Sequence, residues 1–198
     1  MPGCTVMLHW KLLPRMMLLG ILAGLQASLP VSASAEIKKI ALICNGTICP
    51  VFLPELPLPK GWRLDQQMSD ENKIQLLVPA NSSYAEAPAI IYGKAFYNRE
   101  KLTIDSRVET SNRHWRDSVK DARIERLADI ARIKGGSIFQ IHQYINPSES
   151  QQAAELVAFG EDTDKEGNLY GVQIVLSARD LAALTDSKPV FLELLRNY

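Results

Sequence analysis

The sequence lacks an excess of either charge: its 198 residues include 22 Lys and Arg against 22 Asp and Glu. Proteins that bind nucleic acid or anionic membrane surfaces present clustered cations. Neither kind of partner is therefore expected. A hydrophobic content of 46% excludes a disordered chain, and the length suits one globular domain with one targeting segment.

The chain also lacks an apolar run of the roughly 20 residues that a membrane-spanning helix needs. Its longest apolar run, residues 16–25, follows Lys11 and Arg15 and precedes Ala33-Ser34-Ala35. These features, with no acidic residue before Glu36, indicate a secretory signal peptide. We expect cleavage after Ala35, so that residues 1–35 are removed; an uncleaved anchor is the alternative. Residues 36–198 then form a single exported domain, periplasmic or secreted, with no membrane contact.

Cysteine is scarce, and the expected cleavage removes Cys4 with the leader. Cys44 and Cys49 remain as one pair in an oxidising compartment, which predicts a disulfide between them. The intervening Asn45-Gly46 is typical of a tight hairpin turn, which brings the flanking side chains together. A redox or metal site is the alternative. The disulfide is favoured because redox pairs prefer a two-residue spacing and no histidine accompanies this pair.

Alternating apolar residues predict strands in the first half of the exported domain. The alternation occurs at residues 38–44 and 74–78, an apolar run follows at 87–96, and Trp62-Arg63-Leu64 belongs to the same meander. Residues 50–59 contain four prolines, so we expect an extended segment outside the sheet.

From Thr103 the apolar period changes to three or four residues, which predicts an amphipathic helix anchored by Trp115. Residues 124–133 fit a longer helix or a strand, and a strand is favoured. Further strands are expected at residues 139–145, 154–160 and 170–176.

At the end of the chain, Ser177 and Asp180 have the spacing of a capping box, and Pro189 is expected to open a final helix. One side of that helix is apolar, with Val190, Phe191, Leu194, Leu195 and Tyr198. Strands, one helix, more strands and a last helix predict an α+β fold, a mostly antiparallel sheet with helices packed on its faces.

Leu58-Pro59-Lys60-Gly61-Trp62 leads into the first meander, and Val78-Pro79 ends one of its strands. Together with the join at residues 175–179 before the terminal helix, this layout resembles the PsbP/Mog1-like fold, an α-β-α sandwich, over most of residues 55–198. Members include an accessory subunit of the plant oxygen-evolving complex and a regulator of a nuclear-transport GTPase. The resemblance implies a binding surface and no particular chemistry, and no functional residue of those members aligns here.

Two histidines remain after the expected cleavage, His114 and His142. No HExxH, GxSxG or P-loop pattern accompanies them. His142 shares a strand face with Gln140 and Tyr144, opposite Phe139, so we expect it to face solvent. An envelope hydrolase using His142 or His114 is the alternative, with a catalytic site assembled from distant segments.

Asp162, Asp164 and Glu166 followed by Gly167 have the spacing that begins a calcium loop. The twelfth position is Gln173, which cannot supply the bidentate carboxylate, and the flanking residues favour strands. A solvated hairpin turn is therefore favoured, with a calcium-binding module at Asp162 and Asp164 as the alternative.

The sequence thus favours an exported, non-catalytic accessory or binding protein that recognises another protein of the cell envelope. No cofactor, metal or catalytic residue is assigned, and the predicted structural site is the disulfide between Cys44 and Cys49. The two alternatives are the hydrolase and the calcium module.

Overall fold

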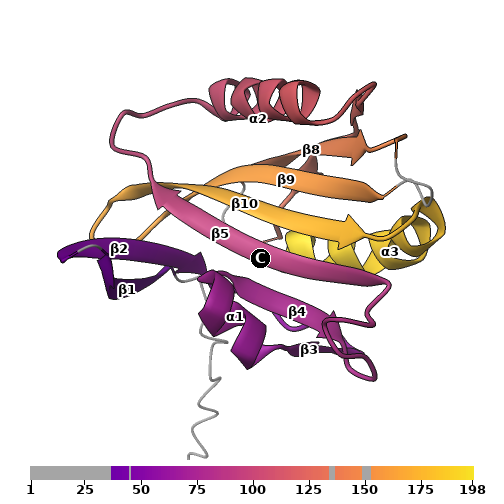
Figure 1. Cartoon of the computed structure of the whole chain (residues 1–198). Helices are drawn as coiled ribbons and strands as arrows, with labels where there is room; N and C mark the ends of the chain where they lie inside the picture. Colours follow the sequence, from indigo (N-terminus) through magenta and orange to yellow (C-terminus); the bar gives the residue numbers. More distant parts are fainter. Residues whose placement is uncertain (1–36, 45, 134–136, 149–152) are drawn as a thin grey trace, which may run out of the picture. The chain divides into compact units, whose positions relative to one another are not determined.

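The computed structural model describes residues 37–44, 46–133, 137–148 and 153–198 (Figure 1). The expected leader and its cleavage site lie outside these residues. The strands are β1 (Ile37–Cys44), β2 (Thr47–Pro54), β3 (Trp62–Leu64), β4 (Gln75–Pro79), β5 (Ala89–Tyr97), β6 (Arg123–Arg126), β7 (Ile130–Ala131), β8 (Ile138–Ile145), β9 (Ala154–Thr163) and β10 (Leu169–Ala178). The helices are α1 (Gln66–Asn72), α2 (Ile104–Ser118) and α3 (Leu181–Asn197). In the described part of the chain, no helix has the length and apolar character needed to cross a membrane.

The described strands form one large sheet in which every pair is antiparallel. Its main path runs β1-β2-β5-β10-β9-β8-β6. β4 pairs with β5 and with β3, and β7 pairs with β8. The central hairpin of β9 and β10 is in register over ten residue pairs, from Leu169–Thr163 to Ala178–Ala154.

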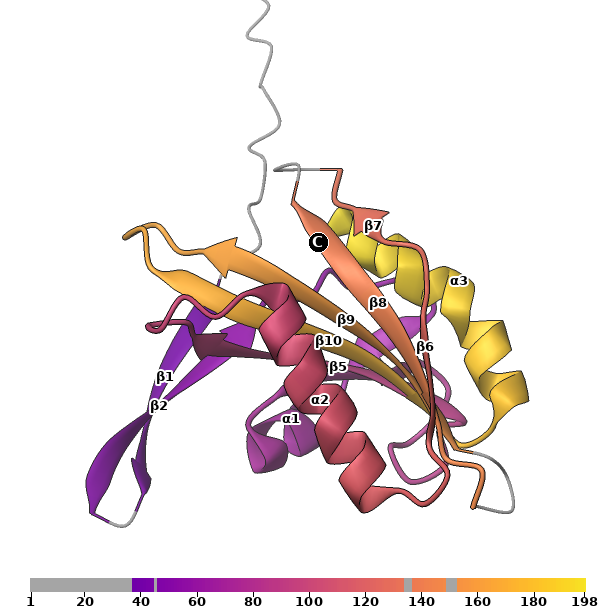
Figure 2. The same ribbon diagram turned by 90° about the horizontal axis from the view of Figure 1, so that it is seen from above.

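The long helices α2 and α3 cover opposite faces of this sheet (Figure 2). On the α3 face, Phe191, Leu194 and Leu195 pack against Ile141, Ala158 and Ile174. On the α2 face, Val108 and Trp115 pack against Tyr144, Val157 and Val175. The predicted α+β sandwich with an antiparallel sheet is therefore confirmed.

The predicted helix at Thr103 is also confirmed. The Thr103 hydroxyl accepts a hydrogen bond from the Ser106 amide and caps α2, and the Trp115 ring stacks on Tyr144 with 5.1 Å between centroids. The residues that follow form β6 and β7, so the strand interpretation of residues 124–133 is right, with a break between two short strands.

Two expectations at the last helix are wrong. Ser177 lies within β10, and Asp180 caps α3 by accepting a hydrogen bond from the Ala183 amide. Pro189 does not open the helix but lies inside it. Leu184 before the proline and Phe191 after it are both buried on the sheet, and this packing maintains one helix across the missing amide donor.

The proline-rich segment was expected outside the sheet, yet residues 50–54 belong to β2. Cys44 and Thr47 flank a two-residue turn and therefore form a hydrogen-bonded pair, so the amide nitrogens of Pro50, Phe52 and Pro54 point away from β1. On that outer side, the described strand pairing of β2 with β5 is between Phe52 and Ala95. The prolines thus remove no hydrogen bond between β1 and β2, and a strand tolerates them at such an edge.

Candidate functional site

The hairpin of β1 and β2, here called the arm, extends away from the rest of the sheet (Figure 2). The predicted hairpin is confirmed by the pairing of Cys44 with Thr47, and Gly46 has a φ of 79°. On one face of its outer half the arm carries four exposed apolar side chains, Ala41, Ile43, Ile48 and Pro50. Ile43 and Ile48 face each other across the strands at exposures of 85% and 76%. Such solvent-exposed apolar pairs indicate a contact surface.

The outer edge of β1 is unpaired in the described structure, since β1 ends the sheet. The hydrogen-bonding alternation that turns the β2 prolines outward also turns the backbone groups of Ile37, Lys39, Ala41 and Ile43 outward. β1 contains no proline and has no charged side chain from Ile40 to Cys44. This edge therefore has the properties of a strand that accepts another strand.

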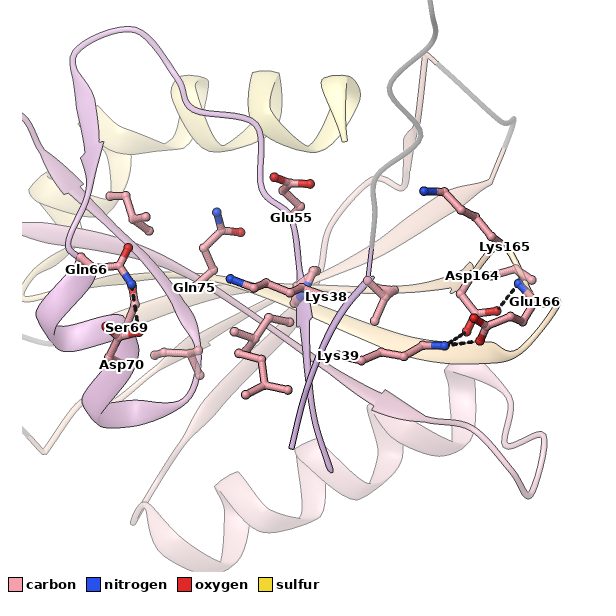
Figure 3. A pocket seen from close by; sticks show the side chains of 17 residues that line it. Lys38, Lys39, Glu55, Gln66, Ser69, Asp70, Gln75, Asp164, Lys165 and Glu166 are labelled. Atoms are coloured by element: carbon pink, nitrogen blue, oxygen red, sulfur yellow. Dashed lines mark hydrogen bonds and ion pairs between the residues drawn. The ribbon is translucent and has the colours of Figure 1, made fainter. Parts of the chain in front are cut away.

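At the base of the arm lies a cavity of about 650 Å³, between β1, α1 and the turn that joins β9 to β10 (Figure 3). Its apolar lining comes from Ile37, Ile40, Leu53, Pro54, Leu64 and Ile74. Charged side chains of both signs surround this lining, among them Lys38, Glu55 and Asp70. Lys38 extends across the cavity toward Gln75 (Figure 3). The cavity can therefore hold an apolar group and offers ion pairs to charges beside it.

An ion-paired cluster fixes one wall of the cavity. Lys39 on β1 contacts Asp164 at 2.9 Å and also Glu166, both on the β9–β10 turn (Figure 3). The Asp164 side chain is 7% exposed and accepts further hydrogen bonds from Asn168 and from the Tyr170 hydroxyl. These contacts tie the arm to the turn between the two central strands.

The electrostatics of this cluster are satisfied internally. Burial raises the pKa of Asp164, but the hydrogen bonds from Asn168 and Lys39 outweigh it and hold the pKa well below its usual range. Hydrogen bonds to Glu166 and Asp164 raise the pKa of Lys39 above its usual value. Both groups therefore stay charged at neutral pH and are unsuited to proton transfer there.

The acidic turn does not gather the carboxylates of a calcium loop. It is the predicted hairpin turn, with Gly167 at a φ of 82°. Asp164 faces Lys39, whereas Asp162 lies on the α3 face beside Arg132 at 3.5 Å. In the described ranges no group of three or more potential ligand side chains could hold a metal ion. The calcium alternative thus has no carboxylate cluster to support it.

The predicted disulfide involves Cys44, whose side chain lies outside the described residues. Cys49 is half-buried and has a free thiol in the described structure. The register pairs Cys49 with Leu42 and Cys44 with Thr47, so the two cysteines are diagonal neighbours on one face of the arm rather than directly opposite. Diagonal neighbours are farther apart than opposite ones, and the disulfide stays a prediction.

His142 was expected at the surface, and this is wrong: it is 6% exposed. It does share a strand face with Gln140 and Tyr144, but α2 covers that face, and Gln140 donates a hydrogen bond to Asp105 on the helix. The His142 ring lies edge-on to Phe159 at 5.9 Å, and its Nε2 atom has no hydrogen-bond partner among the described residues. Burial lowers the pKa of His142, and the nearby Arg126 lowers it further. Asp129 and Asp105 raise it by smaller amounts, so the pKa remains below its ordinary value.

This buried imidazole predicts a loss of stability in mild acid. The folded pKa lies below the ordinary value of 6.5, so the unfolded chain binds the proton first as the pH falls. The free energy of unfolding should then decrease below pH 6.5 by up to about 1.4 kcal/mol per pH unit. Urea unfolding at pH 7.5 and 5.5 checks this, with His142→Phe as the comparison. The variant should lose less stability than the parent; equal losses would show that His142 is not the group responsible.

The two histidines do not form a catalytic pair in the described structure. His114 is exposed on α2, on the outside of the helix under which His142 is buried. Neither imidazole forms a hydrogen bond with a described serine, cysteine or carboxylate. The hydrolase alternative requires a nucleophile within hydrogen-bond reach of a base. The described surroundings of His114 and His142 provide no such pair.

Sequence reasoning did not identify the residues that line the cavity. Ile40, Leu64 and Ile74 were predicted only as strand residues, and Leu53 lay in the segment expected outside the sheet. The usable signal was the alternation at residues 38–44, which predicted the first strand of the arm and the turn after it. Nothing local to the sequence indicates that α1 and the β9–β10 turn meet the base of that hairpin.

Comparison with known proteins found similar solved structures. No protein-family model matches the sequence, and no match was found among curated proteins. Solved structures that are similar include PA94, a protein of unknown function from Pseudomonas aeruginosa, with a TM-score of 0.47 and 12% identity over 82% of this chain and 96% of that one. Another is the Saccharomyces cerevisiae Ran-binding protein Mog1p, with a TM-score of 0.43 and 11% identity over 82% of this chain and 93% of that one.

Proposed function

We propose that this is an exported, non-catalytic accessory protein that binds a segment of another envelope protein in the cavity at the base of the arm. The observation that supports this most is the cavity itself, with apolar side chains at its centre and charges of both signs around them. The proposed export depends on the leader sequence, residues 1–35.

The chemistry of the lining favours an extended polypeptide as the bound group. Ile40, Leu53 and Ile74 offer an apolar surface for one side chain, and Lys38, Glu55 and Asp70 offer ion pairs to its neighbours. Asp164 and Lys39, in the wall of the cavity, form an ion pair that neutralises both charges. Because the pKa of Asp164 is lowered and that of Lys39 is raised, neither group exchanges a proton near neutral pH, which favours binding over catalysis.

Site-specific photocrosslinking in the envelope tests this proposal. A photoreactive residue replaces Leu64, which lines the cavity and is 37% exposed, and in a second protein it replaces Leu102, which is 46% exposed away from the cavity. We expect a discrete adduct with another protein from position 64 and none from position 102. Equal adducts from both positions, or an adduct with lipid alone, would contradict the proposal.

A matched pair of variants sharpens the test. Gln66 lines the cavity and its neighbour Gln67 does not, although each donates a side-chain hydrogen bond four residues ahead on α1, to Asp70 and Glu71. Gln66→Trp fills part of the cavity and should abolish the adduct, whereas Gln67→Trp should leave it intact. An adduct that survives Gln66→Trp would place the binding surface elsewhere.

A further inference from the structure

The cavity is incomplete along the unpaired edge of β1. Four consecutive residues of that strand, Ile37 to Ile40, line it, yet no described strand continues the sheet beyond them. At the other end of the same strand the arm exposes Ile43 and Ile48. One molecule thus presents an open edge with an apolar cavity, and a solvent-exposed apolar tip.

The open edge and the apolar tip are complementary if β1 of one molecule pairs with β1 of a second molecule. In an antiparallel pair of β1 strands related by a two-fold axis, the outward residues of one must meet the outward residues of the other. A register centred on Ile40 satisfies this, because it places Ile37 opposite Ile43 of the second copy and Lys39 opposite Ala41 of the second copy. The tip of each arm then lies beside the cavity of the other molecule.

We infer that two copies of this chain associate by antiparallel pairing of their β1 strands, and that the arm tip of each copy supplies the missing wall of the other's cavity. Each binding site is then built from both copies, with Ile43 and Ile48 contributed by the second. The inference deepens the proposed function, since it takes the cavity as the binding site.

Charge and backbone chemistry favour a second copy on this edge. In the register centred on Ile40 no lysine faces a lysine, because Lys38 lies opposite Leu42 of the second copy. Lys39 is already neutralised by Asp164 and Glu166 of its own chain. The other edge of the arm is unsuitable for pairing, because Pro50 and Pro54 provide no amide donors there. Without residues 1–35, which hold Lys11 and Arg15 and no acidic residue, the chain has a formal net charge of −2, which is too small to keep two copies apart.

Analytical ultracentrifugation of the purified protein tests the inference. The parent should sediment as a dimer at micromolar concentration. Ala41→Pro removes an outward donor from β1 without touching the hydrogen bonds between β1 and β2, and should weaken the dimer at least about tenfold, a loss of about 1.4 kcal/mol. Ile43→Asp with Ile48→Asp changes only exposed side chains and should do the same. Leu102→Asp, at an exposed position away from the arm, should leave the dimer intact.

A monomeric parent, or a dimer that withstands both arm variants, would overturn the inference. The outcome is separable from that of the proposed function. A monomer that still forms the Leu64 adduct with another protein would retain the function and remove the dimer. A dimer whose Leu64 adduct contains only a second copy of this chain would retain the dimer and remove the envelope partner.

Discussion

Gly160→Ala is expected to destabilise the protein by about 3 kcal/mol, because a β-carbon at this position overlaps the ring of Phe139. The nearest atoms would be Cε1 and Cδ1 of that ring, with the latter at 2.6 Å. Phe139 is fully buried and is held by Tyr198 at a centroid distance of 5.6 Å and by the Arg132 guanidinium at 5.4 Å. The ring therefore has no space into which it can withdraw.

Urea unfolding of a double-mutant cycle with Phe139→Leu isolates this contact. In the Phe139→Leu background the space next to Gly160 is larger, so the alanine should cost less than about 1 kcal/mol. If the costs of the two substitutions simply add, the ring is not what requires glycine at position 160. The measurement depends on the midpoint and slope of each transition, so circular dichroism must first show that each variant is folded.

The parts of the fold that were predictable from sequence are those in which one side of an element is apolar. The alternation at residues 38–44 and the three-to-four-residue period from Thr103 gave β1 and α2 correctly. Asn45-Gly46 specified a turn by its own backbone preference. In each case the signal lies within a few residues of the structure that it specifies.

The failures have a common physical cause, which is packing against a distant segment. The alternation in β8 placed His142 and Tyr144 on one face correctly, but both faces of this strand are buried in a sandwich, and only α2 decides that. Pro189 is tolerated in α3 because apolar residues on both sides of it are held by the sheet. The short helix α1 went unpredicted, since its seven residues contain only one apolar side chain, Met68.

The candidate site was the least predictable feature for the same reason. Its walls come from β1, α1 and the β9–β10 turn, which are separated by up to 127 residues in the contact of Lys39 with Glu166. The acidic turn suggested a calcium loop because carboxylates at alternate positions give the same sequence pattern in a calcium loop and at the end of a strand. In a strand those positions share a face only until the chain turns, and Asp162 precedes that turn whereas Asp164 lies within it.

Asp162→Ala is expected to cost about 3 to 5 kcal/mol, since it leaves the Arg132 cation buried without its acid. The two side chains are 12% and 7% exposed, and Nη1 of Arg132 lies 3.5 Å from the carboxylate. The guanidinium also donates to the Glu161 carbonyl at 2.6 Å and lies over the rings of Phe139 and Tyr198. These contacts hold the cation in place, so it cannot reach solvent when the carboxylate is removed.

The double variant Asp162→Ala with Arg132→Met separates the cost of an unpaired charge from the cost of lost packing. Methionine keeps apolar contact with the two rings and removes the charge, so the double variant should be about 2 kcal/mol more stable than Asp162→Ala alone. Chemical unfolding at pH 7 measures both, and Arg126→Met serves as the control because its pair with Asp129 is solvent-exposed and should contribute less than about 1 kcal/mol. A double variant less stable than Asp162→Ala would mean that Arg132 stabilises the α3 face through its hydrogen bond and ring contacts more than its buried charge costs.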